Sequence, residues 1–205
     1  MIIILSGGIG SGKSVAAGML EDMYGFPVYC ADDRVKQLYD EHPTLMSDIE
    51  KVLGEDFRDE EGNFVPSSLA RRIFSDGDAL AKVESLVFPI LKEDFLMWVS
   101  THPSSVHVLE SATILEKDFF RGFGDFALIV TAPFELRLRR AMKRDSASEQ
   151  DIRSRMEKQI LMNDPTLVGA DSCLPTAVCQ NVGSMDDLRS NLAEIIENRV
   201  LTKML

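Results

Sequence analysis

A short glycine-rich segment near the start of the chain restricts its fold more than any other feature. Residues 7–14 read Gly-Gly-Ile-Gly-Ser-Gly-Lys-Ser, which contains the pattern G-x-x-x-x-G-K-S. The apolar run at residues 2–5 precedes it and is typical of a strand buried on both faces of a parallel sheet. Apolar side chains at helical spacing follow, up to a break at Gly25. A strand, a glycine turn and a helix in this order begin a βαβ unit.

The same segment has the composition of a phosphate-binding loop. Glycines allow the backbone conformations in which successive N–H groups converge on phosphate oxygens at a helix N-terminus. In this pattern the lysine, Lys13, reaches the β- and γ-phosphates, and the hydroxyl of Ser14 is placed to bind Mg²⁺. A glycine turn without a ligand is the alternative, and the position between a strand and a helix disfavours it. We therefore predict that the chain binds a nucleoside triphosphate through Gly8, Ile9, Gly10, Ser11, Gly12, Lys13, Ser14 and Val15, with Ser14 as the metal ligand.

Further apolar runs predict the rest of a sheet, and helical periodicity predicts what surrounds it. Strands are predicted over residues 28–30, 106–109, 127–130 and 177–179. The stretch from 34 to about 106 is mostly helical in pattern, with breaks at 42–43, 54, 61–63 and 102–103. A charged helical segment over 135–162 and a closing amphipathic helix complete the pattern. The sequence predicts a three-layer α/β fold of the P-loop NTPase type, with about five parallel strands and an inserted helical lobe.

The charge balance restricts the kinds of ligand that the surface can hold. The 205 residues include 22 Lys and Arg against 33 Asp and Glu, a formal charge of −11. A polyphosphate backbone or an anionic membrane binds to clustered cations, so nucleic acid and membrane partners are excluded. Three cysteines, at positions 30, 173 and 179, have no metal-ligand spacing and favour a reducing compartment. No apolar stretch approaches a membrane span or a signal-peptide core, so we expect a cytoplasmic protein.

Positive charge gathers in one predicted helix after the strand at 127–130. Five cations and no acid lie within residues 137–144. A solvated helix face is the alternative, although such faces usually interleave both signs. Together with a phosphate loop, the cluster predicts a mobile lid over the transferred phosphate. No Asn-Lys-x-Asp motif of Ras-type GTPases is present, and the combination is typical of a small-molecule kinase. The five cations are Arg137, Arg139, Arg140, Lys143 and Arg144.

The chain resembles the dephospho-coenzyme A kinases along essentially its whole length. The run from Ser6 to Ser14 looks like that family's phosphate loop, which is far more specific than the general motif. The chain departs from the family at Cys30, at Phe88-Pro89, at residues 111–116 and in the spacing between Asp171 and Asn181. Further matching segments are Ala31-Asp32, Arg72-Ile73-Phe74, Arg140 with Arg144-Asp145 and Gln159, Ala170-Asp171, and Asn181-x-Gly183.

This resemblance implies phosphorylation of the ribose 3′-hydroxyl of dephospho-CoA by ATP with Mg²⁺, to give coenzyme A and ADP. Asp32, after the second strand, is then the general base or hydroxyl-orienting group, and helix capping is the alternative for such an acid. Lys13, Arg140 and Arg144 contact the phosphates. Glu110 orders a Mg²⁺-bound water or is a structural acid, and Glu116 lies near the acceptor.

The expected organisation is a single P-loop kinase domain over residues 1–205. Within it, about 58–104 form a helical acceptor-binding lobe and about 137–163 form the lid. Two alternatives remain at this point: a kinase of the nucleoside-monophosphate or shikimate type, and a non-catalytic nucleotide-binding protein. The motif itself does not separate ATP from GTP, and the residues leave the oligomeric state open.

Overall fold

A computed structural model describes residues 1–157, 159 and 174–203. The chain divides into two compact units. The first, here called the sheet unit, combines Met1–Cys30 with Ser104–Leu205, and the second, the helical unit, is Ala31–Pro103. One continuous segment is therefore inserted into the sheet unit between its second and third strands. No helix among the described residues is long and apolar enough to cross a membrane.

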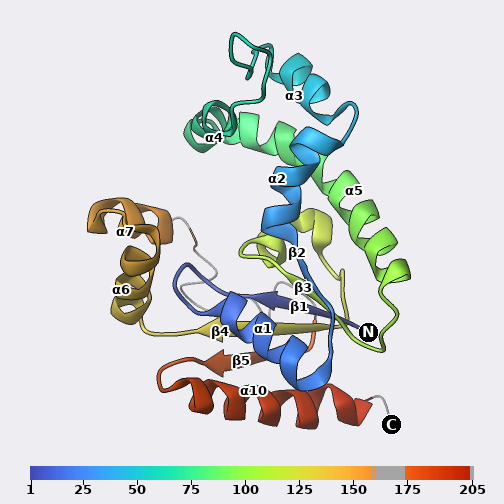
Figure 1. The fold of residues 1–205 in the computed structure, drawn as a ribbon, viewed down its shortest axis with the longest axis vertical. Coiled ribbons are helices and arrows are strands. Elements are labelled where there is room, and N and C mark those ends of the chain that lie inside the picture. The colour runs from blue at the N-terminus through green and yellow to red at the C-terminus, as the bar shows by residue number, and fades with distance from the viewer. Residues whose placement is uncertain (158, 160–173, 204–205) are drawn as a thin grey trace. The chain divides into compact units, whose positions relative to one another are not determined.

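Five strands form one sheet, and every pair of neighbours is parallel (Figure 1). Their order across the sheet is β2-β3-β1-β4-β5, so the first strand of the chain is central. The apolar runs in the sequence coincide with these strands, which confirms the predicted parallel α/β fold. The strands are β1 (Ile2–Ser6), β2 (Val28–Cys30), β3 (His107–Glu110), β4 (Phe126–Thr131) and β5 (Thr176–Gln180).

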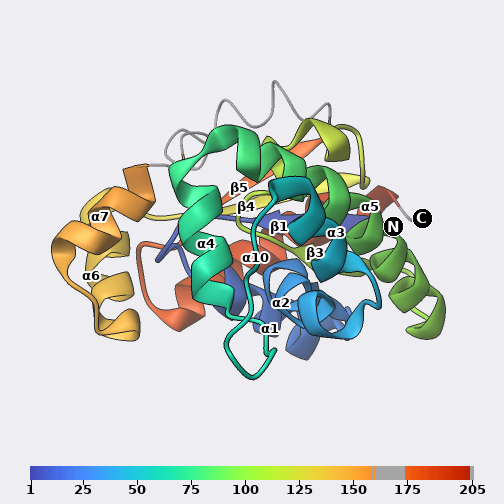
Figure 2. The same ribbon diagram turned by 90° about the horizontal axis from the view of Figure 1, so that it is seen from above.

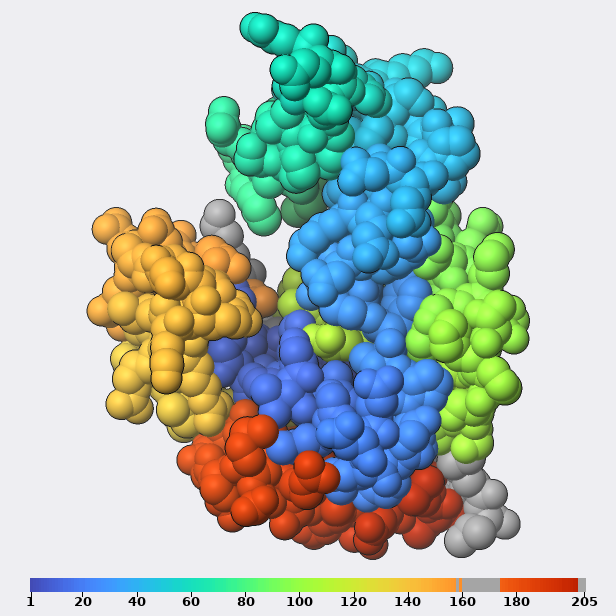
Figure 3. All heavy atoms as spheres, viewed as in Figure 1, coloured from blue at the N-terminus to red at the C-terminus, as the bar shows by residue number. Residues whose placement is uncertain are grey.

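The described helices of the sheet unit include two that pack against each other beside the sheet. Figure 3 shows α1, in dark blue, next to α10, in red, on one face of the molecule. The predicted helical segment 135–162 is two helices in its described part, because Ser146 adopts a left-handed φ of 50° and ends the first of them. These helices are α1 (Lys13–Tyr24), α6 (Phe134–Asp145), α7 (Glu149–Glu157) and α10 (Met185–Arg199), with 3₁₀ turns η1 (Ile114–Glu116), η2 (Asp118–Phe120) and η3 (Leu201–Lys203).

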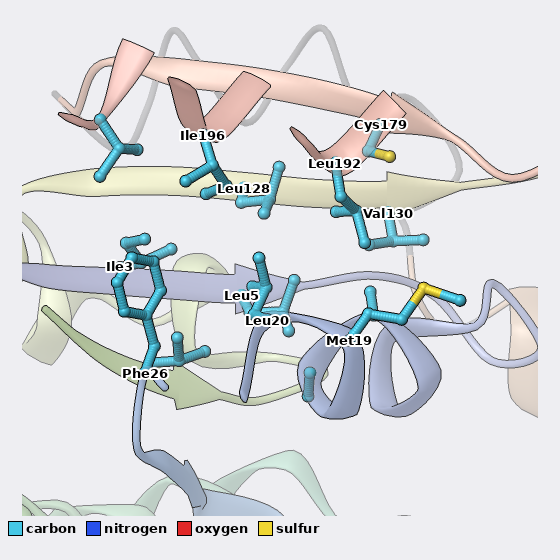
Figure 4. Close-up of a cluster of buried hydrophobic side chains, with 14 of the residues drawn as sticks. Ile3, Leu5, Met19, Leu20, Phe26, Leu128, Val130, Cys179, Leu192 and Ile196 are labelled. Atoms are coloured by element: carbon cyan, nitrogen blue, oxygen red, sulfur yellow. The ribbon is translucent and has the colours of Figure 1, made fainter. Parts of the chain in front are cut away.

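The core of the sheet unit lies between the sheet and these two helices. Figure 4 shows Leu5 and Leu128 of the central strands facing Leu20 of α1 and Leu192 of α10, all fully buried. The three central strands, β1, β3 and β4, are buried along nearly their whole length, which explains their continuous apolar composition. Cys179 of β5 belongs to the same cluster, and burial raises the pKa of its thiol to about 11. Cys179 is thus a small buried hydrophobe, as expected for all three cysteines, whereas Cys30 is only partly buried and Cys173 lies outside the described residues.

The helical unit is built around one long helix. Figure 2 shows α3 and α4 beside α5, and α2 also packs against α5. Arg34 of α2 joins it to α5 through two hydrogen bonds to the carboxylate of Asp94, of 2.9 and 2.8 Å. Such a bidentate pair fixes the geometry of both side chains. The helices are α2 (Ala31–Glu41), α3 (Leu45–Leu53), α4 (Pro66–Ser75) and α5 (Gly77–Thr101).

The four helix breaks predicted between residues 34 and 106 all lie between described helices and strands. The break between α4 and α5 was not predicted. Asp76 ends α4 and caps α5, because its carboxylate accepts hydrogen bonds from the N–H groups of Asp78 and Ala79. An aspartate at this position is a helix-capping signal, and an analysis of apolar periodicity alone does not detect it. Arg72, from the segment that resembles the family, forms ion pairs with Glu55 and Asp76. Residues 58–103 lie within the helical unit, and their assignment as an acceptor-binding lobe stays a prediction.

Candidate active site

The phosphate loop connects the carboxyl end of β1 to the first turn of α1. Gly10 and Gly12 adopt φ values of 75° and 95°, which side chains with a Cβ rarely adopt. The N–H of Ser11 donates to the carbonyl oxygen of Gly8 at 3.0 Å and closes a turn inside the loop. A Cβ at Gly10 would collide with the main-chain oxygen of Arg137, and one at Gly12 with the side-chain amide of Asn181. Both glycines are therefore required by backbone conformation and by close packing.

A buried carboxylate meets the two side chains that end the loop. Glu110, the last residue of β3, is only 4% exposed. Its Oε1 accepts a hydrogen bond from Nζ of Lys13 at 2.6 Å and another from Oγ of Ser14 at 2.9 Å. The sheet register pairs Glu110 with Leu5 of β1 and with Cys30 of β2, so it lies where three neighbouring strands end. Ligands of open α/β sheets bind at this edge.

The side chains of Ser14 and Glu110 are also suited to bind a hard metal ion. A serine hydroxyl and a carboxylate supply oxygen atoms, which Mg²⁺ prefers, and Mg²⁺ usually takes only one or two protein carboxylates beside water and phosphate oxygens. In the part of the chain that the structure describes, no cluster of three or more His, Cys, Asp or Glu side chains forms an all-protein metal cage. The donor set therefore fits a magnesium ion that arrives with a nucleotide.

Two further side chains contact the loop, and the sequence had given neither of them a role. Oε1 of Gln159, a buried residue, accepts a hydrogen bond from the N–H of Ile9 at 2.8 Å. Nδ2 of Asn181 donates to the carbonyl oxygen of Ser11 at 2.8 Å. Both residues lie in segments that resemble the family, so the sequence marked their positions. It could not show which groups their side chains contact, and a role depends on those contacts.

The cations of α6 do not share one environment. Arg137 is buried, lies over the ring of Phe134 with its guanidinium 5.8 Å from the ring centroid, and burial lowers the pKa of Arg137. Arg140 donates from Nη1 to the carbonyl oxygen of Asn181 at 3.1 Å. Arg144 is exposed, and its Nε donates to Asp145 at 2.6 Å, which raises the pKa of Arg144. Of the two predicted phosphate contacts, Arg140 therefore contacts a residue that itself touches the loop, whereas Arg144 pairs with its neighbour in sequence.

The two aspartates after β2 lie in the first turn of α2. That helix begins at Ala31, directly after Cys30, so neither Asp32, for which helix capping was the alternative, nor Asp33 is its N-cap. Asp33 is exposed and accepts a hydrogen bond from Lys36 at 2.6 Å. Asp32 is half-buried and lies two residues beyond the last residue of β2. Acids in a first helical turn are favoured by the helix dipole, which accounts for the pair without assigning a role to either.

Comparison with known proteins decides the family. The family model of the dephospho-CoA kinases matches residues 1–180. The chain belongs to the dephospho-CoA kinase family. The dephospho-CoA kinase of Porphyromonas gingivalis is 38% identical to it over 167 residues, which cover 82% of this chain and 81% of that protein. The predicted family is confirmed.

Solved structures agree with this member of the dephospho-CoA kinase family over nearly its full length. A crystal structure from Thermus thermophilus matches with a TM-score of 0.81 and 26% identity, covering 98% of each chain. Shikimate kinase from Acinetobacter baumannii matches with a TM-score of 0.53 and 17% identity, covering 97% of this chain and 94% of that one. The second likeness is one of fold alone, and the family match does not favour the shikimate-type alternative.

Gly12→Ala tests whether the loop conformation is required for nucleotide binding. We expect the Kd for Mg·ATP, measured by isothermal titration calorimetry, to rise by about tenfold or more, because a Cβ is strained at this φ and collides with Asn181.

Gly18→Ala is the matched control, because this glycine of α1 has open space around its Cβ position. It should leave the Kd unchanged and stabilise the helix by up to about 1 kcal/mol. Equal affinities of both variants for Mg·ATP would contradict the requirement for Gly12.

Proposed function

We propose that this protein transfers the γ-phosphoryl group of ATP to the ribose 3′-hydroxyl of dephospho-CoA, giving coenzyme A and ADP. The observation that carries the proposal is the family match over residues 1–180, which includes the phosphate loop and its partners Glu110 and Gln159. A small-molecule kinase needs a nucleotide site, an acceptor site and neutralisation of the transferred charge.

The sheet unit supplies the nucleotide site. The loop backbone from Gly8 to Gly12 and the amides of the first turn of α1 bind the phosphates, and Lys13 places its ammonium group on the β- and γ-phosphates. Burial of Glu110 against Lys13 and Ser14 holds both side chains at the mouth of the loop before ATP binds. This arrangement supports ATP as the phosphoryl donor, with the adenine preference following from the family.

Ser14 and Glu110 are the residues proposed to hold Mg²⁺, Ser14 directly and Glu110 through water. When bound, Mg²⁺ neutralises charge on the β- and γ-phosphates. Glu110 is suited to this role because its carboxylate already touches the Ser14 hydroxyl at 2.9 Å. A second function follows for the same carboxylate: by pairing with Lys13 at 2.6 Å it keeps that ammonium group oriented toward the loop.

Asp32 is proposed to orient the acceptor hydroxyl and take its proton. Support comes from its place in the first turn of α2, two residues beyond Cys30, which is paired with Glu110 in the sheet register. Arg140 and Arg144 are proposed to meet the transferred phosphate from the lid, residues 137–163, of which 158 and 160–163 lie outside the described part. The helical lobe, residues 58–104, is proposed to bind the acceptor. A cytoplasmic location is also proposed, supported by the cysteine usage.

Incubation with Mg·ATP and a panel of acceptors tests the activity itself. We expect dephospho-CoA to gain one phosphoryl group, while AMP, CMP and shikimate gain none, because the family match specifies the acceptor. The measurement is the acceptor mass by mass spectrometry, with ADP release as a second readout. Phosphorylation of a nucleotide or of shikimate in place of dephospho-CoA would refute the proposal. Binding of ATP without any transfer would favour a non-catalytic protein.

Asp32→Asn tests the general base. We expect kcat to fall by about 100-fold or more, because general base catalysis contributes on this scale, with the Kd for Mg·ATP within about twofold of the wild type. Asp33→Asn is the matched control, since the neighbouring carboxylate pairs with Lys36 on the surface. It should retain the wild-type rate. Equal loss of ATP affinity and rate in Asp32→Asn would assign Asp32 a structural role.

Glu110→Gln tests the magnesium assignment. We expect the Mg²⁺ concentration that gives half-maximal activity to rise several-fold, because an amide lacks the negative charge that attracts the hydrated ion. The measurement is initial rate against free Mg²⁺, with EDTA abolishing activity in every variant. Glu194→Gln, an exposed position on α10, is the control. An unchanged Mg²⁺ dependence accompanied only by a lower melting temperature would leave Glu110 as a structural acid.

A further inference from the structure

Asn181 occupies a fixed position one residue beyond β5. Its N–H donates to the carbonyl oxygen of Thr131 at 2.8 Å, which continues the parallel pairing that ends with Thr131 and Gln180. The residue is only 7% exposed, so its side-chain amide is largely removed from water. A buried amide must find hydrogen-bond partners inside the protein. The main chain thus positions this side chain, and its partners decide its role.

The side chain of Asn181 holds one peptide group of the phosphate loop. Its Nδ2 donates to the carbonyl oxygen of Ser11 at 2.8 Å, in a buried hydrogen bond between residues 170 positions apart. The C=O of Ser11 and the N–H of Gly12 belong to the same trans peptide unit and point in opposite directions. Fixing the oxygen on the side of Asn181 therefore directs the Gly12 N–H away from Asn181.

The same residue also holds a cation of α6. Nη1 of Arg140 donates to the main-chain oxygen of Asn181 at 3.1 Å, and Nη2 lies 3.5 Å from its Oδ1. The helix that carries Arg140 is itself packed on the loop, since a Cβ at Gly10 would collide with the oxygen of Arg137. One residue after β5 thus contacts both a loop peptide and an arginine of the proposed lid.

We propose that Asn181 is a positioning residue that joins the Ser11–Gly12 peptide of the phosphate loop to Arg140 of α6, so that the loop amides and the arginine bind the same phosphates. This inference rests on the proposed function for the phosphate-binding roles of the loop amides and of Arg140. Asn181 acts through its neighbours: its amide orients the loop peptide, and its carbonyl oxygen orients the guanidinium. Loss of the amide leaves the Ser11 oxygen buried without this donor and frees the peptide to rotate.

The experiment compares Asn181→Ala and the near-isosteric Asn181→Leu with the wild-type full chain. Binding of Mg·ATP and of inorganic tripolyphosphate, which reports on the loop without a nucleoside, is measured by calorimetry. We expect both Kd values to rise by about tenfold, with the KM for dephospho-CoA within about twofold. Asn191→Ala is the matched control: this asparagine of α10 donates to the main-chain oxygen of Gln180 at 3.1 Å, on the surface. It should leave both Kd values unchanged.

A double-mutant cycle tests the connection to Arg140. If the two residues act together, Asn181→Ala combined with Arg140→Ala lowers kcat by less than the product of the single effects. Fully independent effects would overturn the connection.

Two other outcomes would overturn the role at the loop. If ATP binding weakens while tripolyphosphate binding is unchanged, Asn181 contributes to binding of the nucleoside and not to the conformation of the phosphate loop. Unchanged Kd values with a lower melting temperature, or unfolding of both variants at the assay temperature, would make Asn181 structural. If the wild type fails to phosphorylate dephospho-CoA, the proposed function fails, while the two Kd values still decide the role of Asn181.

Discussion

The contact of Glu110 with Lys13 and Ser14 is the interaction on which the site depends. A carboxylate that is 4% exposed loses most of its hydration, and its attraction to Lys13 at 2.6 Å offsets that loss. Such a buried pair contributes little net stability compared with apolar packing, but removal of either partner is costly. It therefore fixes geometry: the first turn of α1 is held to the end of β3, 97 positions away in sequence. The parallel register of β1 with β3 is what brings the two within reach.

The glycines of the loop serve packing as much as phosphate binding. Gly10 leaves room for the main chain of α6 at Arg137, and Gly12 leaves room for the amide of Asn181. The loop is consequently enclosed by elements that follow β4 and β5, the two strands on the other side of β1 from β3. The backbone that binds phosphate is held on several sides, which pre-organises its N–H groups and reduces the reorganisation needed when a nucleotide binds.

Strands and loops were predictable from the sequence where a single local pattern was sufficient to identify them. Continuous apolar runs marked all five strands, and the glycine pattern between residues 7 and 14 marked the loop. The break at Ser146 escaped because an isolated left-handed serine carries no periodic signal. The contacts of Gln159 and Asn181 escaped because they join residues 150 and 170 positions apart, and only the folded register shows which side chains meet. Arg140 and Arg144 looked equivalent in sequence, yet the first contacts Asn181 and the second pairs with Asp145.

The division of the chain into two units separates two kinds of effect. Every residue shown to contact the phosphate loop belongs to the sheet unit, whereas Asp32 belongs to the helical unit, two residues beyond β2. Under the proposed roles, donor binding depends on residues of the sheet unit, and transfer depends in addition on Asp32. Substitutions around the loop should alter nucleotide affinity and rate together. If the helical lobe binds the acceptor as proposed, substitutions in the helical unit should alter the rate or acceptor binding while nucleotide affinity stays constant. This contrast gives the kinetic criterion by which the roles of individual residues can be separated.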